Sequence, residues 1–134
     1  MKRTSRSRRA KSTAIELSIR LDLPGIGHIG PGKIELLKQI RTHRSISAAA
    51  RAMKMSYRRA WLLVQDLNDV FAEPIVEKWF GGTARGGAAL TEAGDRLVAS
   101  YEAVVQKSLD ANRAVLNEIL RSAQSREASR SSAS

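Results

Sequence analysis

The sequence contains no cysteine, and this absence removes several kinds of chemistry at once. Without cysteine there is no disulfide framework, no thiolate nucleophile and no zinc or iron–sulfur site with cysteine ligands. No stretch approaches the roughly 18 consecutive apolar residues that a membrane-spanning helix needs, which excludes a membrane span. The first residues are basic but lead into no apolar segment, which argues against a secretory signal. We therefore expect a cytoplasmic protein.

Histidine is scarce too, and neither of the two histidines belongs to a catalytic motif. His28 lies in a glycine-rich segment and His43 near a predicted helix end, with no HExxH and no serine–histidine–acid spacing. Glu92 and Asp95 fall at the start of a predicted helix, where the positive end of the helix dipole suffices to explain them. We expect no catalytic residue, no metal site and no cofactor, and hence a protein that is not an enzyme.

Acidic residues are few compared with basic ones. The chain has 13 Asp and Glu against 23 Lys and Arg, a net charge of +10, which favours nucleic acid as a partner before an anionic membrane. Six of the basic residues fall within positions 1–11, which hold no acid and almost nothing to bury. Residues 1–13 are therefore predicted to be a disordered basic arm, with a mere solubilising tail as the alternative. From position 12 on, 17 basic against 13 acidic residues leave +4.

The length of 134 residues suits one compact domain with extensions. Apolar residues at every second position from Ile15 to Leu23 predict a half-buried strand. The next segment, PGIGHIGPGK, has too many prolines and glycines for a regular element, and KIELLKQIRTHR then predicts a helix ending near His43. After residue 90 the chain is poor in helix breakers, which predicts a long helix capped by Thr91, with Gly94 early in it.

Residues 45–68, SISAAARAMKMSYRRAWLLVQDLN, predict two helices joined by a short break. Ser47 is expected to cap the first helix, whose alanines let another helix cross it at close range. Ser56 is expected to cap the second helix. The apolar stripe that turns this second helix inward is Ala60, Val64 and Leu67.

The first turn of the second helix carries the side chains expected to read DNA. Its outer face would show Tyr57, Arg58 and Arg59 to solvent, and two helices with donors at the start of the second form a helix-turn-helix. An αα-hairpin with a solvated basic face is the plainer interpretation. The strand PIVEKWF and the glycine loop GGTARGGAA favour the helix-turn-helix. They would form a wing on which Arg85 could reach phosphate or the minor groove. A plain hairpin connection is the alternative for that loop.

Together the segments GKIELLKQI, SISAAARAMKMSYRRAWLLVQDLN and PIVEKWFGGTARGGAALTEAGDRLVASY resemble the N-terminal winged-helix domain of ModE-type, molybdate-responsive transcriptional regulators, itself similar to the LysR-type DNA-binding domain. The resemblance covers about residues 32–101. It implies that Ser56 opens the recognition helix, that Gly81 to Ala89 is the wing, and that the helix after L-T-x-x-G forms much of a dimer interface. Full-length regulators of this type continue into oxyanion-binding domains, whereas this chain ends soon after its long helix, so no molybdate binding is expected.

We therefore predict a mainly α-helical chain with a small β-sheet: a winged helix-turn-helix with an N-terminal strand and a long C-terminal dimerisation helix. Its parts would be the arm at 1–13, the DNA-binding domain at 14–90, the dimerisation helix at 91–121 and a disordered tail at 122–134. The residues expected to contact DNA are Ser47, Ser56, Tyr57, Arg58, Arg59 and Arg85. The stripe expected to pair two copies is Leu97, Tyr101, Val105, Leu109, Leu116 and Leu120. A helix lying across its own domain is the alternative to that pairing.

The predicted function is that of a sequence-specific, dimeric transcriptional regulator that binds double-stranded DNA and associates with the nucleoid. Two alternatives stay open: a nucleoid-type protein with little sequence preference, and a winged helix that binds protein or RNA. A ratio of specific to non-specific affinity of about 10³ or more would indicate a regulator. RNA is disfavoured because aromatic residues make up only 4% of the chain and no predicted strand carries paired aromatics for stacking.

Deleting residues 2–11 should weaken binding to all DNA duplexes by a similar factor, because charges on a flexible segment mainly displace counterions. The slope of log K against log salt should flatten by up to about 0.9 for each phosphate that the arm neutralises. Binding titrations over a range of salt concentrations measure both quantities. An unchanged slope would show that the arm takes no part in binding.

Overall fold

The computed structural model describes residues 14–80 and 86–133, so the predicted basic arm and Arg85 lie outside the described residues. The chain divides into two compact units, one of residues Ser18–Val105 and one formed by Met1–Leu17 with Gln106–Ser134. Each unit is described by itself. In the described part of the chain, no helix combines the length and the apolar character needed to cross a membrane.

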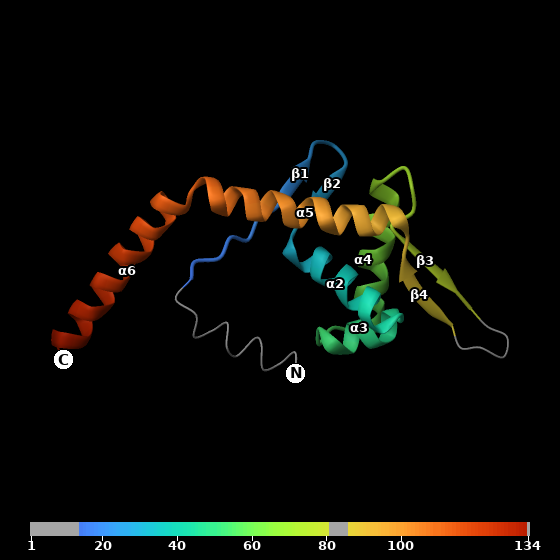
Figure 1. Ribbon diagram of the computed structural model, residues 1–134. Coiled ribbons are helices and arrows are strands. Elements are labelled where there is room, and N and C mark those ends of the chain that lie inside the picture. Colours follow the sequence, from blue (N-terminus) through green and yellow to red (C-terminus); the bar gives the residue numbers. More distant parts are fainter. Residues whose placement is uncertain (1–13, 81–85, 134) are drawn as a thin grey trace. The chain divides into compact units, whose positions relative to one another are not determined.

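The Ser18–Val105 unit is mostly helical and holds two small antiparallel hairpins (Figure 1). Its elements in chain order are β1 (Leu21–Leu23), β2 (Gly27–Ile29), α2 (Pro31–His43), α3 (Ile46–Ala52), α4 (Tyr57–Val70), β3 (Val76–Trp79), β4 (Gly87–Leu90) and the first part of α5 (Glu92–Ala111). The helices and the two hairpins contribute residues to one buried core, which includes Ile29, Leu37, Ile40, Leu67, Ile75 and Val98. The prediction of a mainly α-helical winged helix-turn-helix with small sheets is confirmed.

The N-terminal segment has the predicted alternation of burial, but only its last residues form a strand. Positions 15, 17, 19, 21 and 23 are half-buried and those between them are exposed, while β1 extends only over Leu21–Leu23. The prediction that no regular element follows is wrong, because β2 pairs with β1. Pro24 and Gly25, with Gly25 at φ +73°, make the tight turn, which the Ile26 N–H closes on the Leu23 carbonyl at 2.9 Å. Pro followed by Gly is typical of a type II β-turn, which needs a positive φ at its third residue.

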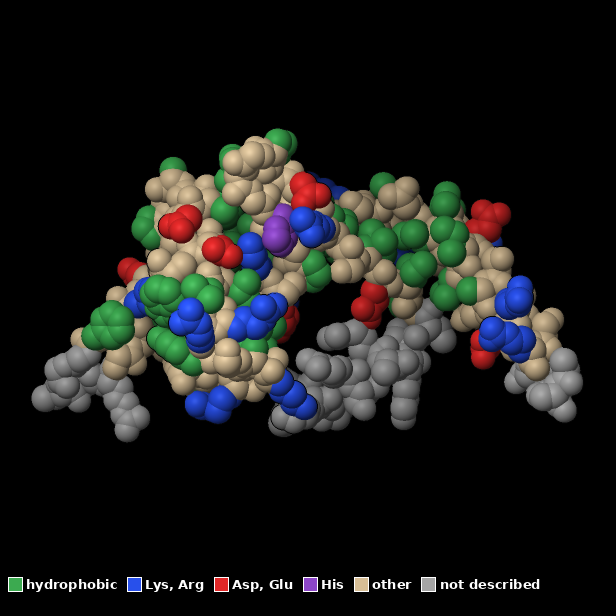
Figure 2. Space-filling view, turned by 180° about the vertical axis from the view of Figure 1, so that it is seen from behind, with side chains coloured by type: hydrophobic (Ala, Val, Ile, Leu, Met, Phe, Trp, Pro, Cys, Tyr) green, Lys and Arg blue, Asp and Glu red, His purple; other side chains and the backbone are tan. Residues whose placement is uncertain are grey.

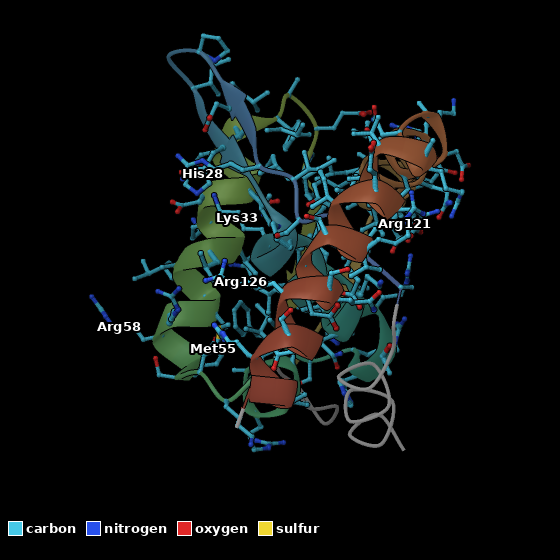
Figure 3. All side chains as sticks on the ribbon, turned by 90° about the vertical axis from the view of Figure 1, so that its left-hand side faces the viewer. His28, Lys33, Met55, Arg58, Arg121 and Arg126 are labelled. Carbon is cyan, nitrogen blue, oxygen red and sulfur yellow. The ribbon has the colours of Figure 1, made fainter. Side chains whose placement is uncertain are left out.

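Helix α2 begins with Pro31, whose missing N–H costs nothing in a first turn, and it ends at His43 as predicted. Arg44 follows in the left-handed conformation and its N–H bonds back to the Ile40 carbonyl. The buried Lys33 donates from Nζ to the His28 carbonyl at 3.0 Å, which ties α2 to the β1–β2 hairpin (Figure 3). Among the described residues, no buried polar side-chain atom is left without a hydrogen-bond partner.

Helix α5 starts against the segment that leads into β3. Thr91 caps it as predicted, because its Oγ1 accepts from the Gly94 N–H at 3.0 Å. The same hydroxyl donates to the Pro74 carbonyl at 2.6 Å. A Cβ on Gly94 would lie 2.3 Å from the Ile75 carbonyl oxygen, so only glycine allows this close approach of helix and backbone.

The second unit contains the end of α5 and α6 (Arg113–Ala133). The prediction was one helix over 91–121 and a disordered tail, whereas the structure has a one-residue interruption at Asn112 and helix to Ala133. Asn112 donates from its side chain to the Ser108 carbonyl at 2.8 Å, a local bond by which asparagine competes with helix hydrogen bonding. The tail holds no glycine or proline, so nothing in it breaks the helix.

Replacing Gly94 with alanine should lower the free energy of unfolding by about 1–3 kcal/mol, because a methyl group cannot fit against rigid backbone. Gly32 is the matched control, since it also lies in a helix and its Cβ would have no neighbour within 4 Å. Gly32→Ala should be neutral or stabilising by up to about 1 kcal/mol, through helix propensity. Chemical denaturation of both variants measures the difference, and equal stabilities would contradict the close approach.

Candidate nucleic-acid interface

Helix α3 is the first helix of the helix-turn-helix, and its capping residue precedes the predicted one in the chain. Ser45, not Ser47, caps it, since the Ser45 Oγ accepts from the Ala48 N–H at 3.0 Å. Ser47 instead lies exposed in the first turn, where Arg51 reaches its Oγ at 3.4 Å. Ser45 takes the capping role because it has the extended backbone that a capping residue requires.

The alanines of α3 serve the close packing that their size predicts. Ala49 and Ala50 are buried, as is Ala60 on α4, whereas Ala52 is exposed. Small side chains on both helices let their backbones approach each other. The crossing of α3 and α4 therefore depends on alanine at these buried positions.

The turn between α3 and α4 is fixed by its own hydrogen bonds. Lys54 has a left-handed backbone with φ 56°, and its N–H bonds the Arg51 carbonyl. The Met55 N–H bonds the Ala50 carbonyl at 3.0 Å, which completes a Schellman-type helix end. The start of α4 is thus held at a set direction from α3.

Helix α4 begins where the sequence predicts and buries the predicted side. Ser56 caps it, with its Oγ accepting from the Arg59 N–H at 3.1 Å, and the predicted inward stripe, Ala60, Val64 and Leu67, is fully buried. Tyr57 is 51% exposed, and Arg58 and Arg59 are exposed beside it. Figure 3 shows Arg58 extending from α4 into solvent. One turn further on, Leu62 is 44% exposed on the outer side of α4, an apolar contact that the sequence analysis did not single out.

Basic side chains are concentrated on the helix-turn-helix and stand there without acidic partners. Residues 44–65 contain five basic residues and no acidic one, although the chain from position 12 on carries only +4. None of these five, within the described residues, forms an ion pair; they are Arg44, Arg51, Lys54, Arg58 and Arg59. Elsewhere, basic residues such as Lys38, Arg41 and Arg96 are paired with carboxylates. Basic residues without an ion pair are thus concentrated in the segment that holds most of the predicted DNA contacts.

The wing is attached to α4 by Asn68, a residue whose role the sequence analysis missed. Its Oδ1 accepts from the N–H groups of Ile75 and Val76 at 2.8 and 3.1 Å, and its Nδ2 donates to the Val76 carbonyl at 3.1 Å. One side chain on α4 therefore fixes the start of strand β3. The only signal in the sequence was the asparagine that ends the segment LLVQDLN.

A second tie joins α4 to the wing through Lys78. Its Nζ donates to the Gln65 Oε1 at 3.1 Å and lies 4.9 Å from the centre of the half-buried Trp61 ring. Lys78 is therefore held by the protein itself. Trp61 and Gln65 act as supports for the wing.

The wing has a second strand where the sequence predicted only loop. Residues 87–90 form β4, which pairs antiparallel with β3 so that Trp79 lies opposite Gly87. A Cβ on Gly87 would lie 2.5 Å from the Trp79 ring, so this glycine makes room for the indole. The predicted wing, Gly81 to Ala89, therefore includes part of a strand.

The residues predicted to form the dimer interface differ in how they are packed within their own chain. Leu97, Tyr101 and Val105 pack against the core of their own domain, and the Tyr101 hydroxyl donates to the Ile19 carbonyl at 2.5 Å. Leu109, Leu116 and Leu120 are half-buried. Larger exposed fractions belong to three neighbours of the predicted stripe: Val104 at 41%, Val115 at 57% and Ile119 at 56%.

These features, a two-helix unit with a fixed turn and a β-hairpin tied to the second helix, define a winged helix-turn-helix domain. Residues 32–95 match the sequence profile of the bacterial regulatory helix-turn-helix proteins of the lysR family. This segment is thus similar to the LysR-type helix-turn-helix domain. Among the described residues, no cluster of three His, Cys, Asp or Glu side chains could hold a metal ion.

Over the same region the chain is similar to ModE-type proteins, in agreement with the resemblance noted in the sequence. It is 46% identical over 76 residues to the molybdenum-pterin-binding protein MopB of Rhodobacter capsulatus, covering 57% of this chain and 28% of that protein. It is 38% identical over 76 residues to the DNA-binding transcriptional dual regulator ModE of Escherichia coli, covering 57% of this chain and 29% of that protein.

The transcriptional regulator ModE of Yersinia pestis is 41% identical over 83 residues, covering 60% of this chain and 32% of that protein. The chain thus matches about a third of the length of these relatives. Among solved structures, a LysR family transcriptional regulator aligns with a TM-score of 0.46 and 20% identity, over 61% of this chain and 26% of that one.

Proposed function

We propose that this protein is a sequence-specific, DNA-binding transcriptional regulator that reads the major groove with the first turn of α4. The observation that carries the proposal is the exposed Tyr57–Arg58–Arg59 turn, capped by Ser56 and free of carboxylate partners in the described part of the chain. The LysR-type domain and the DNA-binding ModE of Escherichia coli support it.

Each side chain of this turn suits a different DNA contact. An arginine donates two hydrogen bonds to guanine in the major groove, which fixes one base pair, and the second arginine can hold a neighbouring base or phosphate. Tyr57 has a hydroxyl for the backbone and a ring for a thymine methyl. Leu62, exposed one turn later, adds an apolar contact at the same face.

We further propose that the protein acts as a homodimer whose two copies pair through α6. Leu97, Tyr101 and Val105 are already used inside their own domain, so they leave the pairing surface to residues further along the chain. On α6, Val115 and Ile119 are four residues apart and more than half exposed, with Leu116 and Leu120 half-buried beside them. An apolar stripe of this kind, exposed on a helix, suits contact with a second copy.

The Arg58→Ala, Arg59→Ala double variant should lose preference for the operator. Each bidentate contact to guanine that is removed should cost about 1–3 kcal/mol and relax the preference at one position. Operators selected from a random duplex library with the wild-type protein provide the probe, and titrations with these and with unrelated duplexes measure the change in affinity. Arg96→Ala, which removes an exposed charge paired with Glu73, is the control and should bind as wild type. Wild-type affinity and specificity in the double variant would refute the assignment.

The Val115→Glu, Ile119→Glu double variant should be monomeric, because buried charges cannot be accommodated in an apolar pairing surface. Light scattering at micromolar concentration should give about twice the 14.7 kDa chain mass for the wild type and the single mass for the variant. Gln124→Glu, an exposed position on α6, serves as the control. The wild-type footprint should be an inverted repeat with half-sites about 34 Å apart, or a multiple of that distance. A wild-type monomer with an unrepeated footprint would contradict the proposed dimer.

A further inference from the structure

The break between α5 and α6 is made by the side chain of Asn112. Its Nδ2 donates to the Ser108 carbonyl at 2.8 Å, whereas its backbone N–H is shared between the carbonyls of Ser108 at 3.2 Å and Leu109 at 3.3 Å. The side chain thus takes the shorter bond to an acceptor that a regular helix leaves to the backbone, and such bonding bends helices. One turn later the Leu116 N–H again lies 2.9 Å from the Asn112 carbonyl. Figure 1 shows that the end of α5 and α6 run in different directions.

This bend is held by contacts on both sides of the break, all within the second unit. The Asp110 carboxylate accepts from the Gln106 Nε2 at 3.1 Å and from the Arg113 guanidinium, so one side chain ties α5 to α6. The N-terminal segment lies against the same place, because Ala14 and Ile15 line a hollow of about 200 Å³ together with residues of both helices. The helices contribute Gln106, Leu109, Arg113, Leu116 and Asn117 to this hollow. The bend is therefore braced.

The break separates two parts of the chain with different proposed tasks. Beyond it, α6 carries the exposed Val115 and Ile119, which are proposed to pair two copies. Figure 2 shows hydrophobic side chains gathered where α5 passes into α6, with Lys and Arg side chains further along α6. Before the break, α5 is one uninterrupted helix over Glu92–Ala111, and its first turn packs against the wing at Gly94. The break thus lies between the pairing surface and the DNA-binding domain in the chain.

The length of α5 makes the direction of the helix at the break important. A helix of 20 residues is about 30 Å long. A change of about 10° in its direction moves its far end by about 5 Å, which exceeds the roughly 3.4 Å between neighbouring base pairs. In a dimer that pairs through α6 the change occurs in both copies. A small change of the bend would therefore alter the distance between the two α4 helices by whole base pairs.

We propose that Asn112 is a specificity-determining residue that acts on the spacing of the operator. By bending the helix between the pairing surface and the DNA-binding domain, it sets the distance between the half-sites that the dimer accepts. Asn112 is a positioning residue, so it leaves the base preference within each half-site unchanged. Ile15 braces the bend that Asn112 makes. This inference rests on the proposed DNA-binding function and on the proposed pairing through α6.

Asn112→Ala removes the side-chain donor and favours a continuous helix. Operators that this variant selects from a random duplex library should keep the wild-type half-site sequence and differ in half-site spacing by one or more base pairs. Affinity for the wild-type operator should fall about tenfold and recover on an operator with the new spacing. Asn112→Ser retains a donor for the Ser108 carbonyl and should keep the wild-type spacing.

Two further variants separate the bend from general effects on the helix. Ile15→Ala removes the brace without touching the break, so it should widen the range of spacings that the dimer accepts. Gln124→Ala is the matched control, because it also replaces an exposed polar residue of α6 by a better helix former. It should select the wild-type spacing. Light scattering should show that all four variants remain dimers.

Wild-type spacing in the operators selected by Asn112→Ala would overturn the inference and leave the proposed function standing. An equal shift in Asn112→Ser would also overturn it, because the hydrogen bond to Ser108 would then not be the cause. A monomeric Asn112→Ala would do the same, since it would show that this residue holds the pairing itself. A wild-type protein that selects no duplex, or only an unrepeated site, would instead refute the proposed function or the proposed dimer.

Discussion

The domain depends on how the backbone of residues 74–76 is held. Asn68 on α4 bonds both N–H groups of Ile75 and Val76, and Thr91 bonds the carbonyls of Pro74 and Ile75 with its hydroxyl. Gly94 leaves the space that this backbone occupies. Helix α4, the wing and α5 therefore meet at three consecutive residues.

This junction explains why the interface can be rigid although its parts are small. Strands β3 and β4 have four residues each, too few to be stable as an isolated hairpin. Asn68 at one end of β3, Lys78 within it, and the contact of the Arg44 guanidinium with the Trp79 ring at the other end attach the hairpin to α4 and to the residue that follows α2. The wing thus has a fixed position relative to helix α4.

The distribution of charge separates the working surface from the rest of the domain. Several basic residues outside the helix-turn-helix pair with carboxylates, as Lys38 does with Glu102 and Arg41 with Asp95. Exposed pairs of this kind contribute little to stability, but they neutralise the surface around them. The unpaired arginines at the start of α4 keep their charge for a ligand, and DNA phosphates are the ligand that such charge attracts most strongly.

The sequence by itself determined the helix-turn-helix, the capping of α4 by Ser56 and of α5 by Thr91, and the outward placement of Tyr57, Arg58 and Arg59. These features follow from side-chain periodicity and local hydrogen bonds, which act within a few residues. The cap at Ser45 is also local, and Ser45 takes it instead of Ser47 because its backbone is extended. Tertiary structure alone decided strand β4, the hydrogen bonds of Asn68 to the start of β3, and the use of Tyr101 inside its own domain. These depend on contacts between different elements, as across the 82 positions between Tyr101 and Ile19, and periodicity carries no record of such partners.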